Sequence, residues 1–189
     1  MNYNKFRIWV GRILGVMLLV FSQGNLNFYA LLLIAIGIFI RIWATGYIHK
    51  NQEVTMAGPY KLLRHPLYLG NFIVGLGFAL FANVWQLVVL YIPIFLGVYY
   101  KKMQLEEHYL LDEFGVKYNI YQEMTPLFIP NLTQLFRKDN VKFNWQNVIL
   151  NREHLNFFGI VIIIIFFFMY QSYSELLKST LLLLTHNFQ

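Results

Sequence analysis

The sequence predicts an all-α, polytopic integral membrane protein with about five transmembrane helices, two of them paired in a hairpin. Three observations predict this fold class: the composition, a series of apolar blocks, and the distribution of basic residues. Of the 189 residues, 58% are hydrophobic and only 13% are charged, whereas soluble domains are typically about 45–50% apolar and about 25% charged. The chain is therefore expected to cross the membrane several times.

The composition also excludes several kinds of site. The chain contains no cysteine, which rules out disulfides, cysteine-ligated zinc and thiol nucleophiles. Its five histidines are scattered without metal-ligand spacing, so no metal site is expected. The formal net charge of +6 could suggest nucleic acid as a partner, but basic residues that flank membrane spans account for it.

Five apolar blocks are predicted to form the membrane helices: residues 8–21, 28–43, 67–81, 84–100 and 157–177. The first follows Lys5 and Arg7 as in a signal peptide, but no small-residue cleavage site follows it, so it is expected to remain as a span. The second begins after a polar SQGNLN turn. Only Ala82 and Asn83 separate the third from the fourth, which predicts a tight helical hairpin. The fifth is long and isolated, and its length favours a helix over a buried strand.

The basic residues predict the orientation of these spans. With five spans, every Lys and Arg except Lys178 lies on the side of the N-terminus. Cytoplasmic loops carry an excess of Lys and Arg, so the N-terminus is predicted to be cytoplasmic. The abundance of Asn, Lys, Ile and Phe favours a bacterial cytoplasmic membrane, and the polar motifs described next all fall on its cytoplasmic face.

The first motif, GPYKLLRHPLYLG at residues 58–70, lies where the second loop meets the third span. Gly58 and Pro59 are typical of a turn, and Pro66 suits the first turn of a helix, where its missing N–H costs nothing. Arg64 and His65 then stand at a helix N-terminus, which favours a carboxylate or a phosphate. The alternative is that Arg64 reaches lipid head groups and His65 only caps the helix.

The second motif follows the fourth span and begins YYKKMQLEE at residues 99–107. If the helix continues, Lys102 and Glu106 lie four residues apart on one face, with Tyr99 and Tyr109 beside them. One alternative is a surface ion pair worth only about 0.3–0.5 kcal/mol. The other is a site for a cation such as a sulfonium, held by a carboxylate and aromatic faces.

Together the two motifs resemble the isoprenylcysteine carboxyl methyltransferase family and the wider group of integral-membrane phospholipid methyltransferases. The resemblance rests on GPY-x3-RHP-x-Y-x-G before the hairpin and EE-x6-FG-x2-Y-x2-Y-x4-P-x3-P after it, and it covers residues 42–130. It implies a methyltransferase core at 42–130, followed at 131–189 by a cytoplasmic connector and a C-terminal transmembrane helix, within a single membrane domain of residues 1–189.

The resemblance implies methyl transfer from S-adenosylmethionine to a lipid or prenylated acceptor. Lys102, Glu106 and Glu107 would be catalytic, and Lys102 and Tyr99 would contact the acceptor. The residues implied to bind the cofactor are Gln52, Glu53, Val54, Thr55, Tyr60, Arg64, His65, Pro66, Leu67, Tyr68 and Glu106.

Two departures from the family pattern leave the acceptor open. Lys102 stands where carboxyl methyltransferases of the family carry an arginine, and lysine lacks the fork that binds a carboxylate through two bonds. Leu127 stands where many bacterial relatives also have arginine. A carboxylate acceptor needs no base, whereas an amine or hydroxyl does, and Glu107, His108 or Glu113 could serve.

Two other functions remain possible at this point. A membrane reductase of the steroid 5-reductase kind, which uses NADPH, has a similarly built C-terminal half and fits the RHP step loosely. A non-catalytic lipid-binding membrane protein explains the apolar blocks and basic loops but not the paired motifs. The sequence leaves the oligomeric state open.

Overall fold

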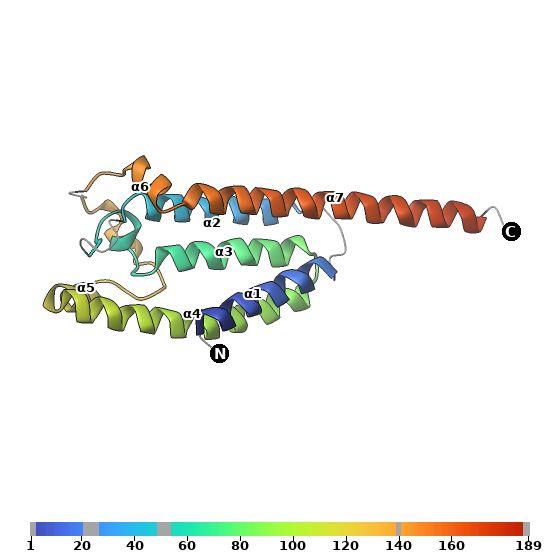
Figure 1. The fold of residues 1–189 in the computed structure, drawn as a ribbon. Helices are drawn as coiled ribbons and strands as arrows, with labels where there is room; N and C mark the ends of the chain where they lie inside the picture. Colours follow the sequence, from blue (N-terminus) through green and yellow to red (C-terminus); the bar gives the residue numbers. More distant parts are fainter. Residues whose placement is uncertain (1–2, 21–26, 49–53, 139–140, 187–189) are drawn as a thin grey trace.

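The computed structural model describes residues 3–20, 27–48, 54–138 and 141–186, and this part of the chain is helical without any strand. Its elements are α1 (Tyr3–Val20), α2 (Phe28–Thr45), η1 (Gly58–Lys61), α3 (Pro66–Phe81), α4 (Trp85–Phe114), α5 (Val116–Met124), η2 (Leu132–Phe136), α6 (Trp145–Leu150) and α7 (Glu153–His186). The all-α prediction is therefore confirmed. Among the described residues, the five predicted apolar blocks lie in α1, α2, α3, α4 and α7, apart from Val84, which is the N-cap of α4. Helices α2, α3 and α4 lie side by side, and α7 runs well past the ends of the others (Figure 1).

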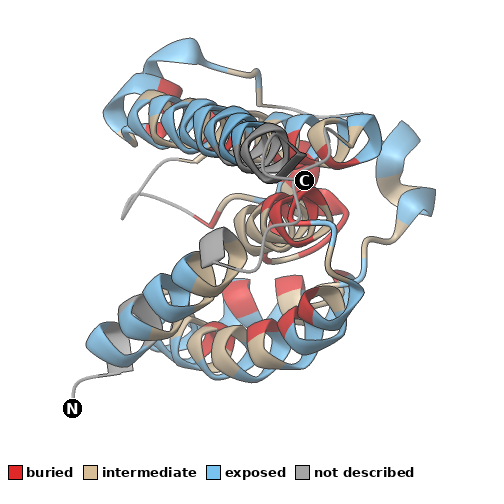
Figure 2. Cartoon of the chain, turned by 90° about the vertical axis from the view of Figure 1, so that its right-hand side faces the viewer, coloured by how far each residue is buried: buried red, intermediate tan, exposed pale blue. Residues whose placement is uncertain are grey.

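Helix α3 lies at the centre of the bundle, and buried residues concentrate on it (Figure 2). Val74 and Phe78 of α3 form a buried cluster with Ile34 of α2, and Ile160 and Ile164 of α7 pack against that cluster. The opposite face of α3 contacts α4. The fold therefore surrounds α3 with apolar neighbours, and the polar motif at its N-terminus emerges at one end of the bundle.

Small residues allow α2 and α3 to approach closely. A Cβ added to Gly37 of α2 would lie 2.7 Å from Val74 Cγ2 and 2.8 Å from the carbonyl oxygen of Gly70. Small residues at helix interfaces are typical of membrane helices, which associate by close van der Waals packing. This contact fixes α3 against α2.

The predicted hairpin of α3 and α4 is present. Asn83, in the short loop between them, has a φ of 56°, a left-handed conformation that asparagine tolerates better than most residues. Helix α4 then runs without a break through the second motif to Phe114. Gly115, with a φ of 53°, reverses the chain into α5. The predicted continuation of the helix past residue 100 is therefore confirmed.

The segment after α5 returns to the first motif. The backbone N–H of Arg64 donates to the carbonyl of Pro126 at 2.9 Å, and the N–H of Asn131 donates to the carbonyl of Leu62 at 2.8 Å. These bonds place the 126–131 segment against the turn that precedes α3. The chain then passes through η2 and α6 before it enters α7.

Two helices in the described part of the chain are long and apolar enough to cross a membrane by length and composition, and they are Phe28–Thr45 and Glu153–Tyr170. Two shorter apolar helical segments are Trp9–Leu18 and Pro66–Phe81. Five spans therefore stay a prediction.

Candidate functional site

The two sequence motifs meet at the N-terminus of α3. Pro66 is the first residue of α3, as predicted, and His65 occupies the N-cap position. The His65 side chain makes no capping bond; its Nε2 instead lies 2.8 Å from Oε1 of Glu107 in α4. The imidazole is buried, so it connects two helices rather than closing the end of one.

Glu107 is the centre of a buried polar cluster. Arg64 pairs with its Oε2 at 2.6 Å, Gln122 Nε2 donates to the same oxygen at 2.6 Å, and the Tyr118 hydroxyl donates to Oε1 at 2.8 Å. Burial alone would raise the pKa of Glu107, but the hydrogen bonds from His65, Gln122 and Tyr118 and the charge of Arg64 outweigh it and lower the pKa to about 2. Glu107 is therefore ionised at neutral pH and is a weak base.

Glu106 has a different environment, because it is on another face of the same helix. Its Oε1 accepts a hydrogen bond from the Tyr68 hydroxyl at 2.6 Å and lies 3.1 Å from Lys102 Nζ. Its Oε2 lies 3.9 Å from His65 Nδ1. The Glu106 side chain is 37% exposed, so this carboxylate is held in place and still open to a ligand. Lys102 and Glu106 therefore share a face of α4, as expected, and form an ion pair.

Aromatic rings connect Glu106 to the interior of the bundle. The Tyr68 ring stacks on His65, with centroids 5.6 Å apart, and meets the Tyr99 ring edge-on at 5.2 Å. Tyr99 in turn stacks on Phe95 at 4.1 Å. These rings form a continuous aromatic wall that ends at the carboxylate.

A large apolar cavity of about 1020 Å³ lies between α1, α3, α4 and α7. Most of its lining is aliphatic or aromatic, and its polar members are Arg12, Asn71, Tyr91 and Tyr99. Because Tyr99 also contacts Tyr68, this cavity lies one aromatic ring away from the residue that holds Glu106. Cavities of roughly 300–1,000 Å³ commonly hold small molecules.

The structure brings together most of the residues that the sequence singled out. Arg64, His65, Tyr68, Tyr99, Lys102, Glu106 and Glu107 form the connected group just described, and Pro66 and Leu67 begin the helix on which Tyr68 lies. Tyr60 is connected to the group through two tyrosines: its carbonyl accepts a hydrogen bond from Tyr121 at 2.7 Å, and the Tyr121 ring contacts that of Tyr118, which bonds Glu107.

Two other predicted residues, Val54 and Thr55, form no hydrogen bond or ion pair with Glu106 in the part of the chain that the structure describes. Val54 packs against Tyr118, which bonds Glu107, and against Tyr121, and both Val54 and Thr55 line a second pocket. Gln52 and Glu53 lie outside the described residues. Of the other residues considered, Tyr109, His108 and Glu113 are exposed and belong to no contact of the group.

Sequence reasoning missed two sets of polar contacts. Tyr118 and Gln122, which hold Glu107, are four residues apart and therefore share a face of α5. Arg41 makes two bonds to Glu153, at 2.7 and 2.8 Å, and also contacts Asn71. A charged residue at the end of an apolar helix needs a partner, and this rule could have indicated from the sequence that Arg41 has one, though not that the partner is Glu153.

The comparisons with known proteins identify the family. The family model for phospholipid methyltransferases matches residues 10–117, more than half of the chain, from within α1 to the start of α5. The chain belongs to the phospholipid methyltransferase family. This confirms the resemblance, because the family is part of the superfamily that includes the isoprenylcysteine carboxyl methyltransferases. The family is one of membrane methyltransferases.

Two curated relatives of this phospholipid methyltransferase family member have names from metal resistance. The nickel-cobalt-cadmium resistance protein NccN of Alcaligenes xylosoxydans xylosoxydans is 36% identical over 53% of this chain and 47% of its own length. The cobalt-zinc-cadmium resistance protein CzcN of Cupriavidus metallidurans is 30% identical over 53% of this chain and 46% of its own length. The match thus spans about half the length of these relatives. No solved structure matches the chain significantly.

Among the described residues, no group of three or more His, Cys, Asp or Glu side chains could hold a metal ion.

Proposed function

We propose that this protein is an integral-membrane methyltransferase that transfers a methyl group from S-adenosylmethionine to a lipid or prenylated, lipid-like acceptor, as isoprenylcysteine carboxyl methyltransferases or phospholipid methyltransferases do. The observation that carries this proposal is the position of Glu106. Its carboxylate is fixed by Tyr68 and Lys102, is 37% exposed, and lies at the end of the aromatic wall that borders the apolar cavity. The polar cofactor and the apolar chain of the acceptor would therefore meet beside Glu106.

The residues at this site fit the chemistry of the cofactor. The Nε atom of Arg64 is buried and has no hydrogen-bond partner among the described residues, so one donor at this site is unsatisfied. The N-terminus of α3 beside it also favours a negative group. Glu106 and the ring of Tyr68 suit a positive group, because a carboxylate and aromatic faces both attract cations. S-adenosylmethionine carries both kinds of group.

The chain's own residues would bind and orient the reactants. When bound, the cofactor supplies a methyl group already activated by its sulfonium charge, so the protein needs no nucleophile. Lys102 and Tyr68 hold Glu106 in one position, which favours in-line approach of the two reactants. The aromatic wall excludes water from the side that faces the cavity. Glu107 would act as a positioning residue, because its low pKa makes it a poor proton acceptor.

The acceptor would lie in the apolar cavity with its reactive group near Tyr99 and Lys102. The cavity is large enough for part of a lipid chain, and four helices line it. Asn71, one of its few polar residues, contacts Arg41 through its amide oxygen, so its amide nitrogen remains the donor for an acceptor oxygen. Lysine at position 102 offers a point charge, which also leaves acceptors other than a carboxylate open.

We further propose five spans with a cytoplasmic N-terminus in a bacterial cytoplasmic membrane. The basic residues support this orientation, and the five long helices support the count. The site would then draw its cofactor from the cytoplasm and its acceptor from the inner leaflet.

The test is calorimetric titration of the detergent-purified protein with S-adenosylhomocysteine. We expect saturable binding that weakens at least tenfold in Glu106→Gln and stays within twofold in Glu123→Gln, a matched change at an exposed position of α5. Methyl transfer to extracted membrane lipids would then identify the acceptor class.

The alternatives predict other results. If the folded protein does not bind S-adenosylhomocysteine but binds NADPH, the result favours a reductase of the steroid 5-reductase kind. If it binds neither cofactor but retains lipid, it is a non-catalytic lipid-binding protein. Either result would refute the methyltransferase proposal.

A further inference from the structure

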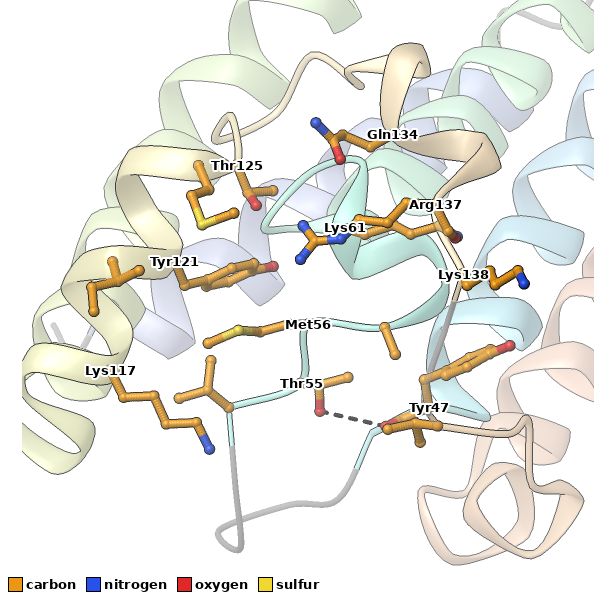
Figure 3. Close-up of a pocket in the computed structure, with 15 residues that line it drawn as sticks. Tyr47, Thr55, Met56, Lys61, Lys117, Tyr121, Thr125, Gln134, Arg137 and Lys138 are labelled. Carbon is orange, nitrogen blue, oxygen red and sulfur yellow. Dashed lines mark hydrogen bonds between the residues drawn. The ribbon is translucent and has the colours of Figure 1, made fainter.

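A second, smaller pocket lies beside the site but does not include its carboxylates. Its volume is about 290 Å³, and it is enclosed by the segment 54–57, η1, α5 and the chain around η2 (Figure 3). Tyr121 forms part of its wall, and Thr55 donates a hydrogen bond to the carbonyl of Tyr47 across one end at 3.4 Å. Neither Glu106 nor Glu107 lines this pocket, but Val54 and Thr55, which the family resemblance implies bind the cofactor, do line it. The charge of the other lining residues decides which ligand the pocket suits.

The charge of the lining is strongly positive. Lys61, Lys117, Arg137 and Lys138 line the pocket, and no acidic side chain does so among the described residues. Glu53 and Asp139 are close in sequence to lining residues and lie outside the described residues. Even if both carboxylates are counted with the pocket, four cations outnumber them.

One of these cations is buried and anchored. Lys61 is only 9% exposed, and its Nζ donates to the backbone carbonyl of Arg137 at 2.6 Å. This bond fixes the chain at residue 137 beside η1, so that the basic residues from two distant parts of the sequence line the same space.

The pocket does not suit the methyl donor. S-adenosylmethionine carries a sulfonium and an ammonium against one carboxylate, so its net charge is positive and a basic pocket would repel it. The pocket also has an apolar side, formed by Met56, Ile120 and Met124. Its chemistry therefore suits an anion attached to an organic body.

We propose that this pocket is a separate binding site for a phosphate group carried by an organic molecule. The phosphate would lie among Lys61, Lys117 and Arg137, because the planar guanidinium of arginine and the ammonium of lysine are the usual phosphate ligands in proteins. The attached organic part would pack on Met56 and Met124. Phospholipid head groups and soluble phosphate compounds both have this chemistry, and the experiment separates them. This site does not depend on the proposed methyltransferase activity.

The experiment compares the full-length protein with Lys117→Gln/Arg137→Gln, which removes two cations of the pocket. Lys142→Gln, an exposed change outside the lining, is the matched control. In one arm, inorganic pyrophosphate is titrated by calorimetry into protein in neutral detergent at about 150 mM salt, where exposed charges are largely screened. In the other arm, native mass spectrometry counts lipid retained from an equal mixture of phosphatidylglycerol and phosphatidylcholine.

We expect the double variant to bind at least tenfold less tightly, or to retain at least fivefold less phosphatidylglycerol, while the control stays within twofold. A difference in the pyrophosphate arm identifies a soluble source, and a difference only in the lipid arm identifies a head group. Equal behaviour of the double variant and the original protein in both arms refutes the site. Loss of S-adenosylhomocysteine binding in the double variant would assign the pocket to the cofactor and also refute it.

Discussion

Exchange of Glu107 for glutamine should destabilise the protein far more than the same exchange at Glu106. The pKa of Glu107 falls from 4.5 to about 2 in the folded protein, and each unit corresponds to about 1.36 kcal/mol. The environment therefore favours the ionised form by roughly 3 kcal/mol. The side chain is only 7% exposed, so solvent screening reduces this value little. For a chain of this size, 3 kcal/mol corresponds to about 6–12 °C in Tm.

The stabilising effect of the Glu107 carboxylate should depend on pH. A carboxylate whose pKa is lowered on folding contributes stability that is fully present above its unfolded pKa, here 4.5, and is lost as the pH falls toward the folded pKa of about 2. Thermal unfolding of the detergent-purified protein should be followed at pH 7, 5, 4 and 3. The difference in Tm between the original protein and Glu107→Gln should be constant from pH 7 to 5 and should narrow below pH 4.5.

The neighbouring variant is the control. Glu106→Gln removes a carboxylate that is 37% exposed, so its Tm should change by no more than about 2 °C, as is usual for exposed pairs. A difference for Glu107→Gln that persists unchanged to pH 3, or that is absent at pH 7, would refute the reasoning, because it would mean that the charge of Glu107 is not what holds the cluster together.

Three further predictions concern packing, an ion pair and the acceptor. Gly37→Leu should lower the free energy of unfolding by about 1–3 kcal/mol, because even the Cβ atom of the new side chain would clash with Gly70 and Val74 of α3. An unchanged Tm would contradict this. Arg41→Ala should cost about 3–5 kcal/mol by leaving Glu153 unpaired and buried, and the double variant Arg41→Met/Glu153→Leu should recover most of the loss in the same unfolding assay. Tyr99→Ala should raise the KM for the acceptor roughly tenfold and leave S-adenosylhomocysteine binding unchanged. Tyr100→Ala, at an exposed position, should change neither. A KM for the acceptor that is the same in Tyr99→Ala and in the original protein would exclude Tyr99 from the acceptor site.

The sequence predicted the helices well because their signals are local. Apolar blocks of helical length, a proline at the first position of α3 and a glycine after Phe114 each act within a few residues. The pairing of Lys102 with Glu106 was also predictable, since positions four apart share a helix face. These features depend on spacing along the chain and need no knowledge of the tertiary structure.

The contacts that complete the candidate site could not be predicted in the same way. Arg64 and Glu107 are separated by the whole hairpin. No pattern in the sequence around residue 106 indicates which of the two adjacent glutamates will face the arginine. The same is true of Arg41 and Glu153, which are 112 positions apart. Such pairs depend on how the helices pack, and that is fixed by close contacts such as the one at Gly37.

The two adjacent glutamates illustrate how one short motif can supply two functions. Neighbouring residues on an α-helix point about 100° apart, so a Glu-Glu pair at the meeting point of α3 and α4 must present its carboxylates to different surroundings. One reaches the buried Arg64 and the hydroxyl of Tyr118; the other faces Tyr68 and Lys102 beside the cavity. The buried carboxylate fixes the backbone of α4 against the start of α3. The exposed one is thereby held where a cationic ligand could meet it, so a change at Glu107 should also disturb Glu106, while a change at Glu106 should leave Glu107 in place.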